Sequence, residues 1–220
     1  MKKIAVLIVA LAACLAAGAQ ECSTTWPYLY PEFREGTIYM KGGTKIRQQV
    51  NVHILRSSLH YLDKGVVKEA FAGDVLVINI GEDRYMVVDG SIMKVVASEE
   101  RGFVAALSLG DFDKLRESGG AYGTSTTNSA TQKYTSLDIA GVNQNHMEMW
   151  ESRHNGDSVD LVTTYYLVTP SLTCKATRKA FEEAIGSERK AAFKAWSKTN
   201  KIKWNNPESI LALIDFLNAE

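Results

Sequence analysis

Hydrophobic and polar residues alternate along most of the chain between residues 37 and 109. This two-residue repeat is typical of β-strands. Turn residues separate the alternating segments, among them Gly42–Gly43 and Asp89–Gly90. Such pairs favour tight hairpin turns, because these turns need positive φ angles. We therefore expect an antiparallel meander that closes as a barrel, a roll or a sandwich. The predicted strands cover residues 37–41, 44–54, 58–62, 66–70, 75–80, 84–88, 92–96 and 103–109.

An aromatic segment precedes the meander, and a second strand-like region follows it. Residues 24–36 include Pro27 and Pro31, which favour an extended backbone. We expect the aromatic side chains of this segment to pack onto the sheet, with an exposed ligand-binding surface as the alternative. Strand-like patterning returns over residues 134–173. The aromatic residues of the first segment are Trp26, Tyr28, Tyr30 and Phe33.

Residues 118–133 are small, polar and rich in glycine, so they cannot fix their conformation by burying apolar surface. We predict a mobile loop here. Tyr122 is its one large apolar residue and is a candidate either to anchor the loop or to contact a partner.

From residue 175 to the end of the chain, the pattern becomes helical. Thr177 is placed to cap a helix that ends at Gly186, and Ser187 to cap the next helix. Asn206 followed by Pro207 is typical of a third helix start. An apolar stripe along this third helix predicts packing against its neighbours. We thus expect an α+β protein, with a β-rich domain over residues 20–174 and a helical region over residues 175–220.

The first 19 residues have the pattern of a signal peptide, with Lys2 and Lys3 before an apolar run and an Ala-Gly-Ala cleavage site before Gln20. We therefore expect an exported protein, periplasmic or extracellular. The segment Leu11-Ala12-Ala13-Cys14 allows a second route, because it is similar to a lipobox. In that case Cys14 would be acylated and would anchor the protein to a membrane.

Cleavage before Gln20 leaves two cysteines, Cys22 and Cys174. In an oxidising compartment such a pair often forms a disulfide, which here would tie the N-terminus to the start of the helical region. Sequence does not show whether the bonding geometry exists. The alternative is two buried, reduced side chains.

The whole chain is electrically balanced, with 25 basic and 25 acidic residues, which argues against a nucleic-acid-binding protein. Residues 175–203 are different, because nine basic and three acidic residues give them a net charge of +6. We interpret these charges as the solvated faces of helices, or alternatively as a docking surface for an acidic polymer or anionic lipid. The candidate partner-binding residues there are Arg178, Lys179, Arg189, Lys190, Lys194 and Lys198.

The sequence contains no G-x-S-x-G nucleophile motif, no phosphate-binding glycine loop and no H-E-x-x-H metal motif. We expect His53 and His60 to be satisfied or exposed strand residues and predict no metal, cofactor or catalytic residue. Asp83 and Asp89 lie at turns and are interpreted as turn residues.

Several segments resemble a group of uncharacterised exported proteins of Bacteroidetes bacteria. They are residues 30–37 (YPEFREGT), Gly42–Gly43, residues 120–125 (GAYGTS) and residues 200–206 (NKIKWNN), together with Tyr165-Tyr166-Leu167. The resemblance implies export and the predicted layout, and the group carries no assigned activity.

The leading hypothesis is a non-enzymatic envelope protein that acts as an interaction module, binding another envelope protein or a glycan. Two alternatives stay open. One is a glycan-active hydrolase or lyase whose two carboxylates converge only in the fold. The other is a carrier that holds a small ligand inside a β-barrel.

Overall fold

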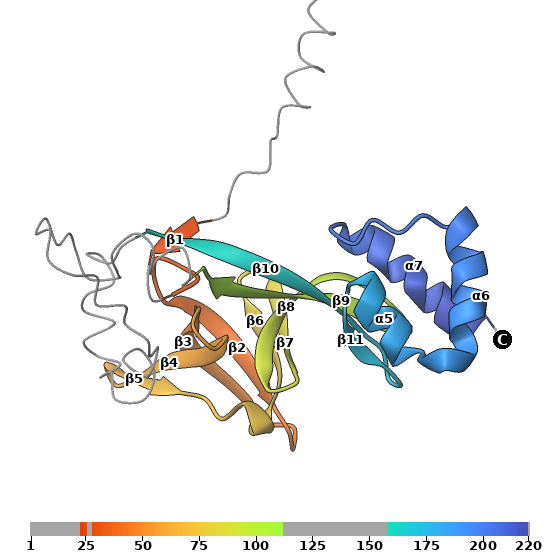
Figure 1. Ribbon diagram of the computed structural model, residues 1–220. Helices are drawn as coiled ribbons and strands as arrows, with labels where there is room; N and C mark the ends of the chain where they lie inside the picture. Colours follow the sequence, from red (N-terminus) through yellow and green to blue (C-terminus); the bar gives the residue numbers. More distant parts are fainter. Residues whose placement is uncertain (1–22, 26–27, 112–157, 220) are drawn as a thin grey trace, which may run out of the picture.

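The computed structural model describes residues 23–25, 28–111 and 158–219, which form an antiparallel sheet followed by three helices (Figure 1). The predicted α+β fold, with a β meander before a helical region, is confirmed. The strands are β1 (Ser23–Thr25), β2 (Arg34–Met40), β3 (Lys45–His53), β4 (Ser58–Asp63), β5 (Val66–Glu69), β6 (Val75–Ile80), β7 (Asp83–Val88), β8 (Ser91–Glu99), β9 (Gly102–Gly110), β10 (Ser158–Val168) and β11 (Thr173–Lys175). The helices are α5 (Arg178–Ala184), α6 (Gly186–Thr199) and α7 (Pro207–Asn218).

The sheet is not closed, so it does not form a barrel, which was one of the three expected forms. Its strands lie in the order β1-β10-β9-β8-β7-β6-β2-β3-β4-β5, and β11 pairs with β10. Strand β6 pairs with β2, where Ile78 lies opposite Ile38, and not with β5, which precedes it in the chain. Two meanders, β2–β5 and β6–β10, are thereby joined along one long-range strand pair.

Tight turns set the register of each hairpin. At the β7–β8 turn, Asp89 and Gly90 both have positive φ angles, of 49° and 79°. Lys64 and Gly65 have the same arrangement, with φ angles of 52° and 80°, at the β4–β5 turn. Two successive positive φ angles match the twist of the flanking strands, and glycine adopts the second without steric cost. The predicted turn positions are therefore correct.

The first hydrophobic core lies between the strands of the two meanders and the aromatic segment that precedes them. Tyr28 and Tyr30 are buried, and the Phe33 ring lies 5.0 Å from that of Tyr28. The predicted packing of the aromatic segment is confirmed for these residues, whereas Trp26 lies outside the described residues. The buried members of this core are Tyr30, Ile38, Val50, Val52, Leu59, Val75, Ile78, Ile80, Tyr85 and Ile92.

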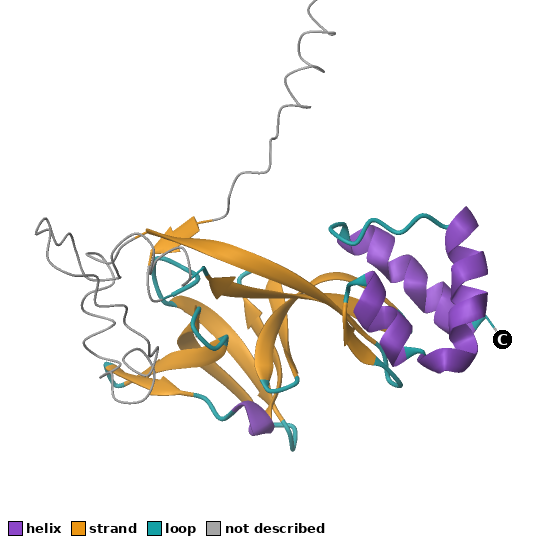
Figure 2. Ribbon diagram, viewed as in Figure 1, coloured by secondary structure: helices purple, strands orange, loops and turns teal. Residues whose placement is uncertain are grey.

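The three helices gather at one end of the sheet, beyond β11 (Figure 2). Phe181 of α5 and Phe193 of α6 are buried, and their ring centroids lie 4.9 Å apart. The predicted caps at Thr177 and Asn206 are confirmed, because their side chains accept hydrogen bonds from backbone N–H groups three residues later. Ser187 was wrongly predicted as a cap: α6 already begins at Gly186, so Ser187 lies inside the helix.

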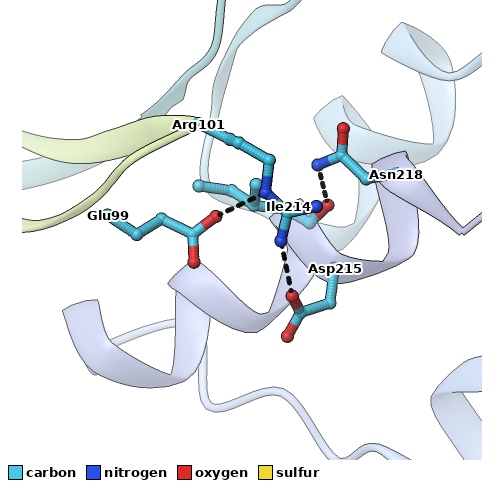
Figure 3. A network of polar contacts seen from close by, with 5 residues as sticks. All are labelled: Glu99, Arg101, Ile214, Asp215 and Asn218. Atoms are coloured by element: carbon cyan, nitrogen blue, oxygen red, sulfur yellow. Dashed lines mark hydrogen bonds and ion pairs between the residues drawn. The ribbon is translucent and has the colours of Figure 1, made fainter.

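Helix α7 joins the helical region to the sheet. Its buried side chains pack in one core with Val104 of β9 and Leu167 of β10. At the edge of this contact, Arg101 from the β8–β9 turn forms ion pairs with Glu99, at 3.7 Å, and with Asp215 of α7, at 3.2 Å (Figure 3). None of the helices described is long and apolar enough to cross a membrane.

Candidate functional site

The candidate surface is built from α5 and α6, whose burial pattern decides which side chains face solvent. Gly186, with a φ angle of 77°, ends α5 and turns the chain into α6. Helix α6 then uses Phe193 and the half-buried Trp196 to pack against the helical core. Side chains three or four residues apart share a helix face, so these two aromatic residues mark the inner face of α6. The opposite face of α6 is exposed to solvent.

Three of the predicted residues form one row on the outer face of α6. Lys190, Lys194 and Lys198 are four residues apart and all exposed, and we call them the lysine stripe. The alanines between them, Ala191 and Ala195, are also exposed. Within the part of the chain that the structure describes, no carboxylate lies within ion-pair distance of these three lysines. Glu188, in the first turn, is the one acidic residue of α6.

Helix α5 adds a surface of mixed charge next to the stripe. Arg178 is exposed but committed to an ion pair with Glu182 at 2.7 Å. Lys179 is exposed on the same helix. An open hollow between the two helices is lined by Arg178, Lys179, Glu182, Glu183 and Lys190. Two of its five lining residues are acidic, so the hollow is less cationic than the stripe.

Arg189 lies away from this surface and is committed to an internal contact. Its guanidinium donates hydrogen bonds to the backbone oxygens of Phe216, at 3.0 Å, and Leu217, at 3.3 Å. It also lies 4.9 Å above the centre of the Phe216 ring. Since backbone carbonyls at a helix C-terminus carry partial negative charge, Arg189 stabilises the end of α7. Only α5 and α6 lysines and Arg178 therefore remain as surface candidates.

Cys174 lies on β11 and is half-buried, and burial raises the pKa of its thiol to about 11. Its predicted disulfide partner, Cys22, lies outside the described residues, as does Tyr122. Ser23 pairs with Asp160 of β10, whereas Cys174 pairs with Leu167, seven positions further along the same strand. At about 3.3 Å per residue this offset is about 23 Å, and a disulfide needs Cα atoms within about 7 Å. This offset describes Ser23 and Cys174 only, and the disulfide stays a prediction.

A buried aromatic cluster lies where the N-terminal segment crosses β3 and β4. The rings of His53 and His60 are stacked, with centroids 4.9 Å apart, and Tyr28 hydrogen-bonds to Nδ1 of His60 at 2.9 Å. Both histidines are buried, so the alternative prediction that they are exposed strand residues is wrong. Among the described residues no group of three or more His, Cys, Asp or Glu side chains is arranged to hold a metal ion.

A second polar cluster joins the N-terminal segment to β7 and β8. Tyr30 donates a hydrogen bond to Asp83 at 2.8 Å and shares a short one with Tyr85. Lys94 lies 2.6 Å from the other Asp83 oxygen, and the Arg34 guanidinium lies 4.2 Å above the Tyr30 ring. Sequence reasoning missed this cluster, because 53 residues separate Tyr30 from Asp83 and no local pattern links them.

The charges in this second cluster identify it as a structural connection. Burial, followed by the hydrogen bonds and charges of Tyr85 and Asp83, raises the pKa of Tyr30. Burial also raises the pKa of Tyr85, to about 12. For Asp83, burial favours a higher pKa, but hydrogen bonds from Lys94 and Tyr30 outweigh it and lower the pKa. At neutral pH both phenols are therefore protonated and Asp83 is ionised, which suits hydrogen bonding better than proton abstraction.

No protein family, curated protein or solved structure matches the chain.

Proposed function

We propose that this is an exported, non-enzymatic envelope protein that acts as an interaction module, and that it binds its partner through the outer face of α6. The observation that carries this proposal is the lysine stripe, three exposed cations with no carboxylate partner among the described residues. The lysine stripe does not stabilise α6, because like charges four residues apart on a helix repel one another. Export, periplasmic or extracellular, is proposed from the N-terminal pattern, with acylation at Cys14 as the alternative.

The alternatives have less support. A small-ligand carrier would need an enclosed barrel interior, and the sheet is open. A glycan-active enzyme would need two carboxylates facing a cleft. Asp83, the carboxylate of the second polar cluster, is instead held by Lys94 and Tyr30, so we do not assign it a catalytic role.

Photo-crosslinking in cells tests the proposal. A photoreactive amino acid replaces Ala195, which is exposed between Lys194 and Lys198. The control variant carries the same group at Lys41, an exposed position in the β2–β3 turn. We expect a light-dependent adduct of higher mass at position 195 and not at position 41. Equal adducts at both positions, or none at position 195, would count against α6 as the binding face.

A further inference from the structure

We propose that the lysine stripe binds a linear acidic polysaccharide, an inference that rests on α6 being the binding face and goes on to name the chemistry of its partner. The stripe consists of Lys190, Lys194 and Lys198, all exposed on the outer face of α6. In the described part of the chain none of them is neutralised by a carboxylate. Among the described residues, an anionic partner would therefore displace no ion pair from these lysines.

The spacing of the stripe favours a polymer over a small anion. Lysines four residues apart are separated by about 6 Å along the helix axis, so the three cover about 12 Å. One small anion contacts one lysine, or two at most. A chain with a carboxylate on successive sugars can contact all three at once, and the second and third contacts are then intramolecular. Ala191 and Ala195 lie beside this row and carry no large side chain that would obstruct a polymer.

The side chains around the stripe argue against a membrane as the partner. Helices that lie in a membrane interface insert Trp, Phe or Leu side chains below the headgroups. On α6 the aromatic residues Phe193 and Trp196 belong to the helical core. The outward positions beside the lysines hold alanines. This face can therefore attract an anionic surface by charge but offers no large apolar side chain for insertion.

A protein partner is also less well matched. Protein interfaces draw most of their affinity from aromatic and arginine anchors in the centre of the contact. Arg189, the arginine of α6, is committed to the end of α7, and Arg178 of α5 is paired with Glu182. What remains on the outer face of α6 is a row of point charges, which suits a flexible polyanion.

Binding to polygalacturonate tests this inference, with fully methyl-esterified polygalacturonate as the uncharged control polymer. The protein is purified in whichever processed form the cell exports. We expect binding to the acidic polymer alone. For three neutralised lysines, log K should fall with log salt concentration with a slope of about −2, if each contact contributes about 0.7 as on single-stranded polyanions.

The variant Lys190→Gln/Lys194→Gln/Lys198→Gln removes the stripe but leaves every core residue in place. We expect it to bind the acidic polymer at least about tenfold more weakly, with a salt slope close to zero. The charge-matched control is Lys41→Gln/Arg56→Gln/Arg84→Gln, which changes three exposed cations in the β2–β3 turn, the β3–β4 turn and β7. The control should bind like the original protein, and both variants should keep its melting temperature.

Three outcomes would overturn the inference: equal loss in both triple variants, equal binding of the two polymers, or stripe-dependent binding to phosphatidylglycerol vesicles without binding to polygalacturonate. The last outcome would assign the stripe to a lipid surface. If the Ala195 crosslink forms with a protein while polygalacturonate does not bind, the proposed interaction module stands and the polysaccharide does not. If neither is seen, both proposals fail.

Discussion

Tyr30 donates a hydrogen bond to Asp83 across 53 residues of sequence, at 2.8 Å, and this contact fastens the N-terminal segment to the start of β7. Asp83 also accepts from Lys94 at 2.6 Å, so one carboxylate connects three parts of the chain. The backbone of Tyr30 is held in addition by two hydrogen bonds with the Asn51 side chain.

The Asp83 connection predicts a loss of stability in acid. Because the pKa of Asp83 is lowered in the folded state, its contribution is present above the unfolded-state pKa, near 4, and is lost as pH falls through the folded value. Asp83→Asn should reduce the free energy of unfolding at pH 7 by about 1–2 kcal/mol. It should also flatten the dependence of stability on pH below 4. Urea unfolding between pH 2 and pH 7 measures both. A variant with an unchanged acid slope would contradict the assignment.

Asn51 should be needed to hold the N-terminal segment in place. Its buried side chain accepts from the backbone N–H of Tyr30 at 3.1 Å and donates to the backbone oxygen of Tyr30 at 2.8 Å. Asn51→Ala leaves these buried groups without partners, at a cost of about 2–3 kcal/mol. The half-buried Asn79, whose side chain forms no hydrogen bond within the described residues, is the matched control. Asn79→Ala should cost clearly less in the same denaturant titration.

Gly102 should be indispensable where α7 meets the sheet. A Cβ atom at this position would lie 2.6 Å from the backbone oxygen of Val168 and 3.0 Å from Cδ1 of Ile214. Gly102→Ala should therefore destabilise the protein by about 1–3 kcal/mol. Adding Ile214→Val relieves one contact but leaves the backbone oxygen and Cγ2 of Thr169, which is also 3.0 Å away, so the double variant should not recover the lost stability. Thermal unfolding of the single and double variants measures this, and recovery in the double variant would show that the Ile214 contact alone was responsible.

Arg189 should contribute to the stability of the helical region and not to partner binding. Its hydrogen bonds to the last carbonyls of α7 predict a loss of about 1–2 kcal/mol for Arg189→Gln. Arg189→Lys should recover part of this loss, because lysine keeps the charge but lacks the planar fork. Polygalacturonate binding should stay the same in both variants. Weaker polymer binding by a fully folded Arg189→Lys variant would instead place this residue on the binding surface.

Cys174 should behave as a slowly reacting free thiol. Thiolate is the reactive form, and a pKa of about 11 leaves little of it at neutral pH. In a Cys22→Ser variant, alkylation of native protein at pH 7.5 should be slow and should accelerate as pH rises towards 11, up to the onset of alkaline unfolding.

The disulfide between Cys22 and Cys174 is tested directly by counting free thiols in the unfolded, unreduced protein that retains Cys22. The predicted disulfide leaves neither Cys22 nor Cys174 as a free thiol, and two free thiols at these positions would contradict it.

The local elements were predictable from sequence, because their causes lie within a few residues. Alternation of apolar side chains marked the strands of both meanders, and the positive φ angles at Asp89 and Gly90 follow from the turn chemistry of that pair. The side chains of Thr177 and Asn206 reach backbone groups only three residues away, so their caps were predictable as well. Ser187 failed as a predicted cap because the chain enters α6 directly from the left-handed Gly186.

How these elements meet depends on contacts between residues that are far apart in the chain. Ile38 of β2 is as well suited to pair with one apolar strand as with another, so its pairing with Ile78 of β6 depends on how the whole sheet buries its core. The Tyr30–Asp83 contact depends on that arrangement in turn. The charges of residues 175–203 were visible in the sequence, but burial and hydrogen bonding separated Arg189, which stabilises α7, from the exposed lysines of α6. The sequence does not distinguish a basic side chain that binds a backbone carbonyl from one that is exposed to solvent. The difference depends on neighbouring residues that only the folded chain brings close.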